Sequence, residues 1–334
     1  MKAFVVEKYG KTSELTLTDV PEPEMRDDDI LVQIHAAGVN VLDGKIKDGE
    51  FKIILPYRLP LILGNDLAGT VVKVGAHVRR FKVGDEVYAR PDQKRIGSFA
   101  ERIALNERDA ALKPASLSME EAASVPLVGL TAWQALVEIG QIRPGDRVFI
   151  QAGSGGVGTF AVQLAKHFGA EVATTASTAN FELLRQLGAD VLIDYRTQDF
   201  EQQLKNYDFV LHSQGTAELE KSLRILKPGG QLISISGPPD PAFAKRANLP
   251  LPVRGAISLL SRRARHQAKR RGVNYTFLFM RAEGQQLEKI SGLIDSGVIR
   301  PIVEKVFPFA ETPEALAHVE SGRARGKIVV QGSS

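Results

Sequence analysis

The chain has 334 residues, of which 43% are hydrophobic and 25% charged, which is ordinary for a globular protein with room for two domains. It has no cysteine, which excludes disulfides, a cysteine nucleophile and thiolate metal sites, and its six histidines form no H-x-x-x-H or H-E-x-x-H pair. No stretch approaches the roughly 20 apolar residues of a membrane span, and the N-terminus has no signal-peptide pattern. We therefore expect a cytoplasmic protein.

The net charge of +4 is unevenly distributed, because six of the ten residues from Arg262 to Arg271 are lysine or arginine. Such a run is typical of a solvated helix face. An anionic membrane surface or a nucleic acid is the alternative partner. No aromatic residues are interleaved with these cations to favour RNA.

Residues 1 to about 120 contain short alternating apolar runs separated by glycines, such as Leu31–His35, Leu67–Val74 and Asp85–Tyr88. This pattern predicts a β-rich module. From Ser118 the spacing of apolar residues becomes helical and continues to Gly140. The change predicts a domain boundary in this region.

A short β-branched and aromatic run, Asp146–Ile150, leads into a glycine-rich turn and then into a helical pattern over 159–168. Three glycines of the turn fit G-x-G-x-x-G, in which one permits the tight turn, one the approach of a pyrophosphate and one the packing of helix on strand. The strand-turn-helix context predicts a dinucleotide site, because N–H groups that open a helix hold phosphates. The residues expected to bind are Gly153, Ser154, Gly155, Gly156, Val157 and Gly158.

Strand and helix patterns alternate beyond this turn, which predicts βαβ units and a parallel sheet. The expected strands are 171–175, 191–194, 208–211 and 231–235, with helices at 180–187 and 217–226. Residues 238–272 resemble an insertion with a basic helix near Leu259–Arg271. The last sixty residues predict a strand at 275–279, a helix at 284–296 and a closing strand at 326–330.

The order of several short motifs resembles that of the medium-chain dehydrogenase/reductase superfamily, specifically its zinc-free quinone oxidoreductase branch. The motifs are Gly38-Val-Asn-Val-Leu-Asp43 with Lys45, Gly64-Asn-Asp-Leu-Ala-Gly-Thr-Val71, Gly84–Val87, Leu130–Leu136, Ala152–Gly158, Leu187–Asp190, Leu226–Gly230 and Gly326-Lys327. The resemblance covers nearly the whole chain.

This resemblance implies an α/β protein with two domains. Residues 124–274 would form a Rossmann domain with a doubly wound parallel sheet and a basic helical insertion near 238–272. Residues 1–123 and 275–334 would form a GroES-like, mostly-β catalytic domain. The resemblance also implies a homodimer joined edge to edge through the parallel sheet near Gln231–Ile235.

The zinc-dependent branch would have a cysteine within Asn40–Asp43, a His-Glu pair after Gly64 and a four-cysteine lobe near Ile96. This chain has Asn65-Asp66 after Gly64 and no cysteine at all. The ligands of both zinc sites are therefore missing, and we expect no metal site. A zinc alcohol dehydrogenase mechanism is excluded.

The second strand of the predicted sheet ends in Thr174-Thr-Ala-Ser177, where an NAD-preferring site usually has an acidic residue for the ribose 2′-OH. The one acid nearby, Glu171, begins that strand. Hydroxyl groups do not repel a 2′-phosphate, and the resemblance adds Tyr195 as a phosphate donor. We expect NADPH as cofactor, with positive charge from Arg196 or Arg185. Ordinary strand-end hydrogen bonding explains Ser177 and Tyr195 equally well.

Hydride transfer to a quinone or enone leaves negative charge on the substrate oxygen, which hydrogen-bond donors must stabilise in the absence of a metal. The resemblance places Asn40, Asp43 and Lys45 beside the nicotinamide, with Tyr57 on the loop before Gly64. We expect Asn40 to polarise the carbonyl and Tyr57 or Lys45 to hydrogen-bond to it, with the proton coming from one of them or from water. Alternatively, Asn40 and Asp43 cap a turn and a helix, and Lys45 is solvated.

The resemblance assigns four further residues to the cofactor. Thr131 would open a helix that faces it, and Gly237, Phe277 and Phe279 would lie along the nicotinamide. The two phenylalanines also fit the core face of a strand at period two. His212-Ser-Gln-Gly215 departs from the Asp-x-x-Gly that relatives often show after the fourth strand.

The sequence therefore predicts an NADPH-dependent, metal-independent reductase of quinones or α,β-unsaturated carbonyls. An enoyl-thioester reductase is the enzymatic alternative, in which the basic insertion would meet a coenzyme A phosphate. From a different class comes a cofactor-gated binding protein, in which the basic helix 262–271 would contact RNA or a membrane surface.

Overall fold

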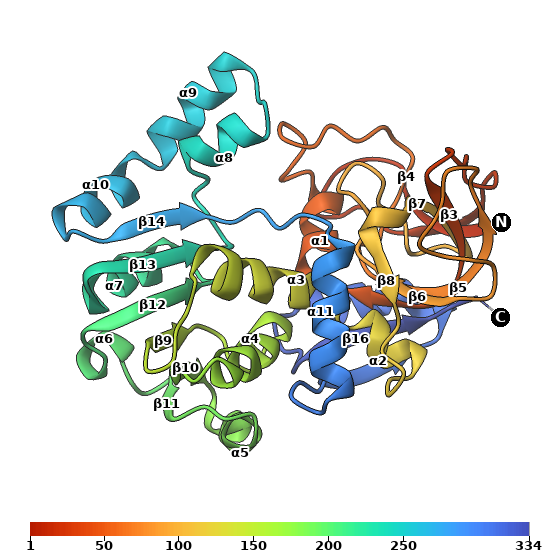
Figure 1. Cartoon of the computed structure of the whole chain (residues 1–334). Helices are drawn as coiled ribbons and strands as arrows, with labels where there is room; N and C mark the ends of the chain where they lie inside the picture. The colour runs from red at the N-terminus through yellow and green to blue at the C-terminus, as the bar shows by residue number, and fades with distance from the viewer. Residues whose placement is uncertain (334) are drawn as a thin grey trace. The chain divides into compact units, whose positions relative to one another are not determined.

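The computed structural model describes residues 1–333, and the chain divides into two compact units (Figure 1). Unit 1 comprises Met1–Leu130 together with the segment that begins at Arg281. Unit 2 comprises Thr131–Met280. The chain thus leaves unit 1 and returns to it a few residues beyond positions 123 and 274, which the sequence indicates as boundaries.

Unit 1 is built from β-sheets whose strands are mostly antiparallel. One sheet has the order β2-β1-β4, and the other has the order β15-β16-β3-β5-β6-β8, with β7 also paired to β3. In β3, Ile30, Val32 and Ile34 alternate toward the core and are at most 1% exposed, as the alternating pattern predicts. The strands are β1 Lys2–Val6, β2 Thr16–Asp19, β3 Asp29–Val39, β4 Leu61–Ile62, β5 Leu67–Val74, β6 Glu86–Ala89, β7 Arg102–Asn106, β8 Ala110–Leu112, β15 Val303–Phe307 and β16 Lys327–Gln331.

Short helices connect these strands. They are α1 Val41–Asp48, α2 Met119–Ala123, α11 Gly284–Asp295 and α12 Thr312–Glu320, with 3₁₀ turns at Glu107–Asp109 and Phe309–Glu311. The helix α3, Pro126–Trp133, contains the change from unit 1 to unit 2 and continues as a π-helical segment, Gln134–Ile139. The helix α1 begins directly after Asn40, whose backbone N–H donates to the Asp43 carboxylate at 2.8 Å.

Unit 2 contains a parallel sheet with the strand order β11-β10-β9-β12-β13-β14. Val148, Phe149 and Ile150 of the central strand are fully buried, which requires cover on both faces of the sheet. The predicted Rossmann-type sheet is confirmed. Its strands are β9 Arg147–Ile150, β10 Glu171–Ala176, β11 Val191–Asp194, β12 Tyr207–His212, β13 Leu226–Ser234 and β14 Asn274–Phe277.

The position of β14 corrects one expectation. Residues 231–234 belong to β13, which pairs with β12 on one side and with β14 on the other. An edge-to-edge contact through Gln231–Ile235 is therefore wrong, because β14 already occupies that edge. The homodimer itself stays a prediction.

The helices of unit 2 are α4 Gly156–His167, α5 Phe181–Gln186, α6 Phe200–Gln203, α7 Thr216–Ile225, α8 Pro241–Arg246, α9 Leu251–Leu260 and α10 Arg262–Arg270, with a 3₁₀ turn at Thr178–Asn180. The predicted basic helix is in fact the end of α9 followed by α10, which the buried Ser261 separates. The helix α10 lies against β14 and α7 (Figure 1).

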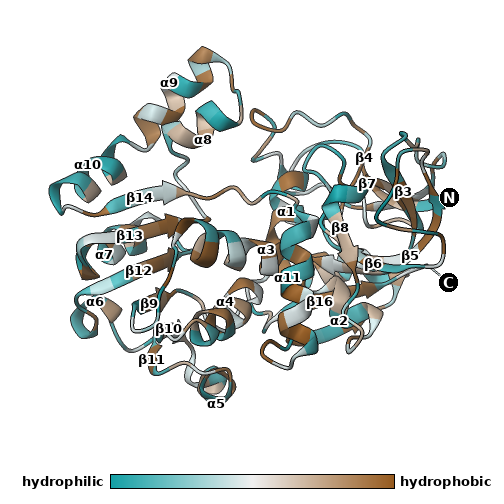
Figure 2. Ribbon diagram, viewed as in Figure 1, coloured by the Kyte–Doolittle hydropathy of each residue, from teal (hydrophilic) through white to brown (hydrophobic). Residues whose placement is uncertain are grey.

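None of the helices in residues 1–333 combines the length and the apolar character that crossing a membrane requires. The cytoplasmic location stays a prediction. Hydropathy changes along the insertion, where α10 is mainly hydrophilic and α9 has strongly hydrophobic positions (Figure 2).

Candidate functional site

The glycines of the predicted dinucleotide turn differ in what their surroundings tolerate. A Cβ on Gly153 would collide with the Thr174 side chain, and a Cβ on Gly158 would collide with the carbonyl oxygen of Ala152 and the backbone of Gly153. A Cβ on Gly155 would meet only the carbonyl oxygen of Ala152, at 3.4 Å. The outer glycines are thus required by the packing of strand, turn and helix, and Gly155 leaves space for a ligand.

Two threonines of the neighbouring strand β10 form hydrogen bonds with this turn and with the strand that leads into it. The hydroxyl of Thr174 donates to the carbonyl oxygen of Ile150 at 2.6 Å, and Thr175 accepts at its hydroxyl from the N–H of Ala152 at 3.1 Å. The N–H of Gly153 donates to the carbonyl oxygen of Thr175 at 2.9 Å. The first two hydroxyls of the run from Thr174 to Ser177 therefore stabilise the turn.

The helix α4 begins at the turn, with Gly155 as its N-cap and Gly156, Val157 and Gly158 as its first three residues. The N–H groups of a first helical turn have no acceptor within the helix, and the helix dipole favours an anion there. Residues Ser154 to Val157 are partly exposed, so they are accessible to a ligand. The segment fits the pyrophosphate of a dinucleotide.

Ser177 and Tyr195 lie side by side, because each follows the carboxyl end of one of two paired strands. Ala176 at the end of β10 is in register with Asp194 at the end of β11. Tyr195 is 61% exposed, and the guanidinium of Arg196 lies 5.8 Å from its ring centre. Ser177 is buried and accepts from Asn180 at 3.3 Å. The structure thus brings together the hydroxyls predicted to face a 2′-phosphate.

The other predicted cation, Arg185, lies on α5 and pairs with Glu182 at 3.7 Å. The acid of β10, Glu171, is at the opposite end of the strand from Ser177, where it pairs with Arg147 at 3.4 Å. Arg196 is exposed, and its guanidinium forms no ion pair among residues 1–333. It is the cation better placed for an anionic ligand.

His212 connects the carboxyl ends of β12 and β13. Its Nε2 lies 3.1 Å from the carbonyl oxygen of Gly215, which can only accept, so this nitrogen carries the proton. Its Nδ1 lies 3.0 Å from the hydroxyl of Ser234 and 3.2 Å from that of Ser236. Burial lowers the pKa of His212 to about 4, so the ring is neutral at physiological pH.

Gly237, predicted to lie along the nicotinamide, belongs to this same network. Its N–H donates to the Ser234 hydroxyl at 3.1 Å, and its φ of +102° suits glycine. His212 therefore ties together the two loops that follow β12 and β13. Ligands of parallel sheets bind at such carboxyl ends.

The predicted Phe277 and Phe279 pack in an aromatic cluster with Phe243, with ring centres 5.2 Å and 5.5 Å from its own. The N–H of Phe277 donates to the Asp240 carboxylate at 2.9 Å. Phe277 is buried at the end of β14, as the core alternative predicts, whereas Phe279 is only half-buried and lies beyond that strand. Thr131 is buried in α3, at 5% exposure.

In unit 1 a set of polar side chains is almost fully buried, and we call it the polar cluster. Its members are Asn40, Asp43, Asn65, Asp66, Arg90 and Lys327, each at most 5% exposed. They come from the start of α1, the residues before β5, the end of β6 and the start of β16. The two segments whose equivalents would carry zinc ligands in the zinc-dependent branch thus come together here.

Lys327 is the cation at the centre of the polar cluster. Its Nζ donates to Asn40 Oδ1 at 2.6 Å and to the carbonyl oxygen of Val39 at 3.0 Å, and lies 3.3 Å from Asp66 Oδ2. The Asn40 amide in turn donates to Asp66 Oδ2 at 2.9 Å and to the carbonyl oxygen of Gly38 at 3.3 Å. Both amide hydrogens of Asn40 therefore have acceptors within unit 1.

The second half of the polar cluster surrounds Asp43. One of its carboxylate oxygens accepts from Asn65 Nδ2 at 2.7 Å, and the other accepts from the N–H of Asn40. Arg90 donates to Asn65 Oδ1 at 3.3 Å, whereas its Nε has no acceptor in the described part of the chain. The cluster thus retains one unused donor.

Burial dominates the electrostatics of the polar cluster. It raises the pKa of Asp43 to about 7 and raises the pKa of Asp66, against the lowering effect of Lys327. It lowers the pKa of Arg90. Within residues 1–333 no three His, Cys, Asp or Glu side chains are grouped so that they could hold a metal ion.

Two further predicted residues, Lys45 and Tyr57, lie outside the polar cluster. Lys45 is half-exposed on α1, with Glu50 3.7 Å from its Nζ. The hydroxyl of Tyr57 donates to the carbonyl oxygen of Gln93 at 2.6 Å, and burial raises its pKa. The hydroxyl is therefore protonated at any physiological pH.

Four members of the polar cluster have no role predicted from the sequence, namely Asn65, Asp66, Arg90 and Lys327. Asn65-Asp66 and Lys327 did occur in motifs of the resemblance. The polar residues Asn65 and Asp66, directly before an apolar strand, could have indicated a buried polar group, and a buried charge needs a partner such as Lys327. Nothing in the sequence marks Arg90.

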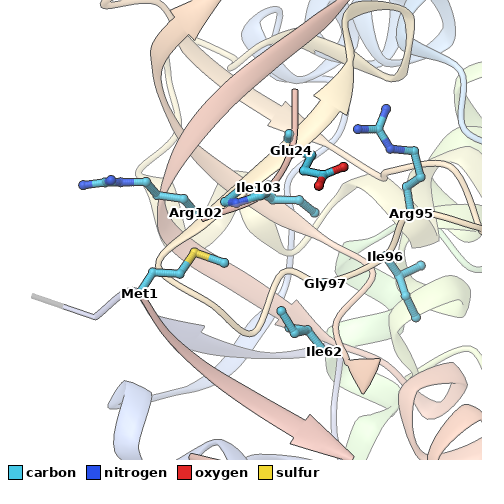
Figure 3. A pocket seen from close by; sticks show the side chains of 10 residues that line it. Met1, Glu24, Ile62, Arg95, Ile96, Gly97, Arg102 and Ile103 are labelled. Carbon is cyan, nitrogen blue, oxygen red and sulfur yellow. The ribbon is translucent and has the colours of Figure 1, made fainter. Parts of the chain in front are cut away.

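Unit 1 also has a pocket of about 210 Å³, to which none of the predicted site residues contributes (Figure 3). Both arginines that line it already have acidic partners. Arg95 donates to both Asp29 oxygens at 2.7 Å, and Arg102 pairs with Glu22 at 2.9 Å. This pocket is therefore not a candidate site.

Residues 26–115 match the family described as alcohol dehydrogenase GroES-like domain, and residues 187–330 match that described as zinc-binding dehydrogenase. The mitochondrial NAD(P)H oxidoreductase RTN4IP1 of Danio rerio is 36% identical to this chain, over 99% of this chain and 91% of that protein. The chain belongs to the medium-chain dehydrogenase/reductase superfamily. Within this superfamily it falls in the zinc-free quinone oxidoreductase branch.

Two further comparisons extend this result. The chloroplastic NADPH-dependent alkenal/one oxidoreductase of Arabidopsis thaliana is 35% identical, over 99% of this chain and 79% of that protein. The structure of the quinone oxidoreductase from Coxiella burnetii has a TM-score of 0.85 and 30% identity, over 99% of both chains. This member of the superfamily is therefore an oxidoreductase that uses a nicotinamide cofactor.

Proposed function

We propose that this protein is an NADPH-dependent, metal-independent reductase of quinones and α,β-unsaturated carbonyl compounds. The observation that carries the proposal is the dinucleotide turn of unit 2, where Gly155 leaves space for a pyrophosphate and no acid ends β10. The names of the relatives, an alkenal/one oxidoreductase and a quinone oxidoreductase, support conjugated acceptors.

A preference for NADPH is supported by the ends of β10 and β11. Tyr195 and Arg196 are exposed there, beside Ser177, and Glu171 is at the far end of its strand. A guanidinium binds phosphate oxygens strongly, whereas a carboxylate at this place would repel them. We therefore propose Tyr195 and Arg196 as the groups that bind the 2′-phosphate.

A bound nicotinamide supplies a hydride, which in an enone joins the β-carbon while the carbonyl oxygen gains the negative charge. Lys45 has ammonium hydrogens beyond its contact with Glu50 and can donate to that oxygen, whereas the one hydrogen of the protonated Tyr57 hydroxyl must first leave the carbonyl oxygen of Gln93. We propose that one of them, or water, then supplies the proton that completes the reduction.

We propose that Asn40 positions other residues and does not polarise the substrate carbonyl. Because both its amide hydrogens and its Oδ1 are engaged by Gly38, Asp66 and Lys327, it acts as a positioning residue. It fixes the start of α1, the helix that carries Lys45.

Steady-state kinetics with NADPH and NADH, over quinones, enals and enones, test the activity. We expect a higher kcat/KM with NADPH and measurable turnover of quinone and enone acceptors. Crotonyl-CoA serves as the rival acceptor, and a kcat/KM above that of every quinone and enone would make the chain an enoyl-thioester reductase. A lower KM for NADH would contradict the cofactor assignment.

The variant Arg196→Gln tests the phosphate site. We expect the KM for NADPH to rise about tenfold, the loss of one charge-assisted contact, with no change in the KM for NADH. Arg185→Gln is the matched control, because that guanidinium already pairs with Glu182. Equal effects of Arg196→Gln on both cofactors would refute the assignment.

A further inference from the structure

The helix α9 turns an apolar face toward solvent. All of its exposed residues are apolar, and they form two adjacent rows at i, i+4, i+8: Leu251, Gly255 and Leu259 in one row, and Pro252, Ala256 and Leu260 in the other. Leu251, Leu259 and Leu260 are 78%, 70% and 68% exposed. A Cβ on Gly255 would meet open space.

The two polar residues of α9, Arg254 and Ser258, lie on the other side of the helix, and neither is exposed. Arg254 is partly buried and donates to the carbonyl oxygen of Leu249 at 2.6 Å and to Asn248 Oδ1 at 3.2 Å. Ile257 is 4% exposed. A surface helix of a globular protein normally presents its charges outward. In α9, by contrast, the exposed residues are apolar. An exposed apolar patch of this kind indicates an interaction surface.

The next helix, α10, presents cations. Its buried residues are Ala264 and Ala268, which pack into the core of unit 2. Its exposed residues are Arg262, Arg263, His266, Lys269 and Arg270. Arg263 pairs with Glu220 at 2.7 Å, but the other three cations have no ion-pair partner in the part of the chain that the structure describes.

We propose that α9 and α10 dock this protein on an anionic lipid surface, with the leucines of α9 inserted among the acyl chains and the cations of α10 at the headgroups. An apolar face beside a basic one is the combination that interfacial binding requires, since either alone binds weakly. The proposal is independent of the proposed reductase activity.

The charge of the surface argues against two other occupants. A second copy of this chain would bring the same cations opposite one another across a two-fold contact, which repel. A single-stranded nucleic acid would use aromatic side chains for stacking, and α9 and α10 contain no Phe, Tyr or Trp.

The test is sedimentation of the purified full chain with vesicles, either of phosphatidylcholine alone or of equal parts phosphatidylcholine and phosphatidylglycerol. We expect binding to the second kind only, weakening with added salt. The variant Leu251→Ser/Leu259→Ser/Leu260→Ser should bind about tenfold more weakly. Its control is Ile53→Ser/Val83→Ser/Leu112→Ser, whose side chains are 67%, 59% and 54% exposed in unit 1.

The charge contribution is tested with Arg262→Glu/Lys269→Glu/Arg270→Glu, which should abolish binding to the anionic vesicles. The control Lys8→Glu/Lys11→Glu/Lys73→Glu makes the same change of charge at exposed lysines of unit 1 and should bind like the parent. None of these positions is buried, so we expect every variant to fold like the parent. Thermal unfolding checks this.

Failure to bind anionic vesicles, or binding that neither set of α9 and α10 variants weakens, overturns the proposal. Two further outcomes overturn it in favour of another occupant. If vesicles are not bound and the leucine variant lowers the molecular mass in light scattering, the face joins copies of this chain. If vesicles are not bound and the charge variant alone abolishes binding to single-stranded RNA, the cations of α10 bind RNA.

Discussion

The dinucleotide turn of unit 2 is held by hydrogen bonds of backbone groups and of the uncharged Thr174 and Thr175 hydroxyls, and its outer glycines leave room for no side chain, whereas the polar cluster of unit 1 is held by charged side chains. Gly153 and Gly158 have no room for a methyl group, and the turn itself has no charge. In the polar cluster, Asp66 and Lys327 are buried and depend on each other. The turn should therefore be sensitive to added volume, and the cluster to a changed balance of charge.

The largest effect is expected from Lys327→Met, which keeps the volume and removes the charge. The buried carboxylate of Asp66 would lose its cation, and removal of one partner of a buried pair costs about 3–5 kcal/mol. Chemical denaturation measures the free energy of unfolding. Lys45→Met is the control, because its ion pair with Glu50 is half-exposed and should contribute less than about 1 kcal/mol. Similar losses in both variants would show that the charge of the polar cluster is not what holds it.

His212 sharpens the comparison, because it is a buried polar group of unit 2 that is kept neutral. Its pKa of about 4 lies below the ordinary value of 6.5, so the stability it contributes is present above pH 6.5 and is lost as the pH falls toward 4. We expect the free energy of unfolding of the parent to fall between pH 7.5 and 4.5 by about 2–3 kcal/mol more than that of His212→Asn. His77→Asn, at an exposed histidine, should fall like the parent. An identical pH dependence of parent and His212→Asn would contradict the buried, neutral ring.

The smallest effect on stability is expected in the turn. Gly158→Ala should cost about 1–3 kcal/mol of unfolding free energy, because its Cβ meets backbone atoms that cannot move far. Gly155→Ala should cost little, since its Cβ makes one ordinary contact, yet it should weaken NADPH binding by placing a methyl group in the ligand space. Denaturation and fluorescence titration with NADPH measure the two properties. If Gly155→Ala loses as much stability as Gly158→Ala, the middle glycine is structural rather than reserved for ligand.

The sequence predicts those parts of the molecule that depend on local pattern. The strands β5, β9 and β10 and the helix α4 lie within a few residues of their expected positions, because apolar spacing and glycine placement determine them. The sequence indicates the short helix α1 only through the alternative that Asp43 caps a helix, whereas the structure has Asn40 at the N-cap and Asp43 within the first turn. The place of β14 beside β13 is a matter of topology, which no local pattern encodes.

The residues of the polar cluster show where prediction from sequence ends. Asn40 and Asp43 were recognisable through their motif, but Arg90 and Lys327 are single charges in or beside apolar strands. Whether such a residue points to solvent or into a core depends on which strands are neighbours. The exposed apolar rows of α9 were equally hidden, because the predicted helix begins only near Leu259 and an apolar row does not by itself show whether another element covers it.

The strand β16 has a consequence for the order of folding. It lies between β15 and β3, and its Lys327 reaches Val39 and Asn40, which precede it by almost the whole chain. Unit 2 is contiguous and can fold as soon as it leaves the ribosome, whereas the larger sheet of unit 1 waits for a strand made about 290 residues after β3. Until then β3 has an open edge and Asp66 lacks its cation, so nascent unit 1 exposes an unpaired strand edge for longer than any strand of unit 2 has to wait for its partner.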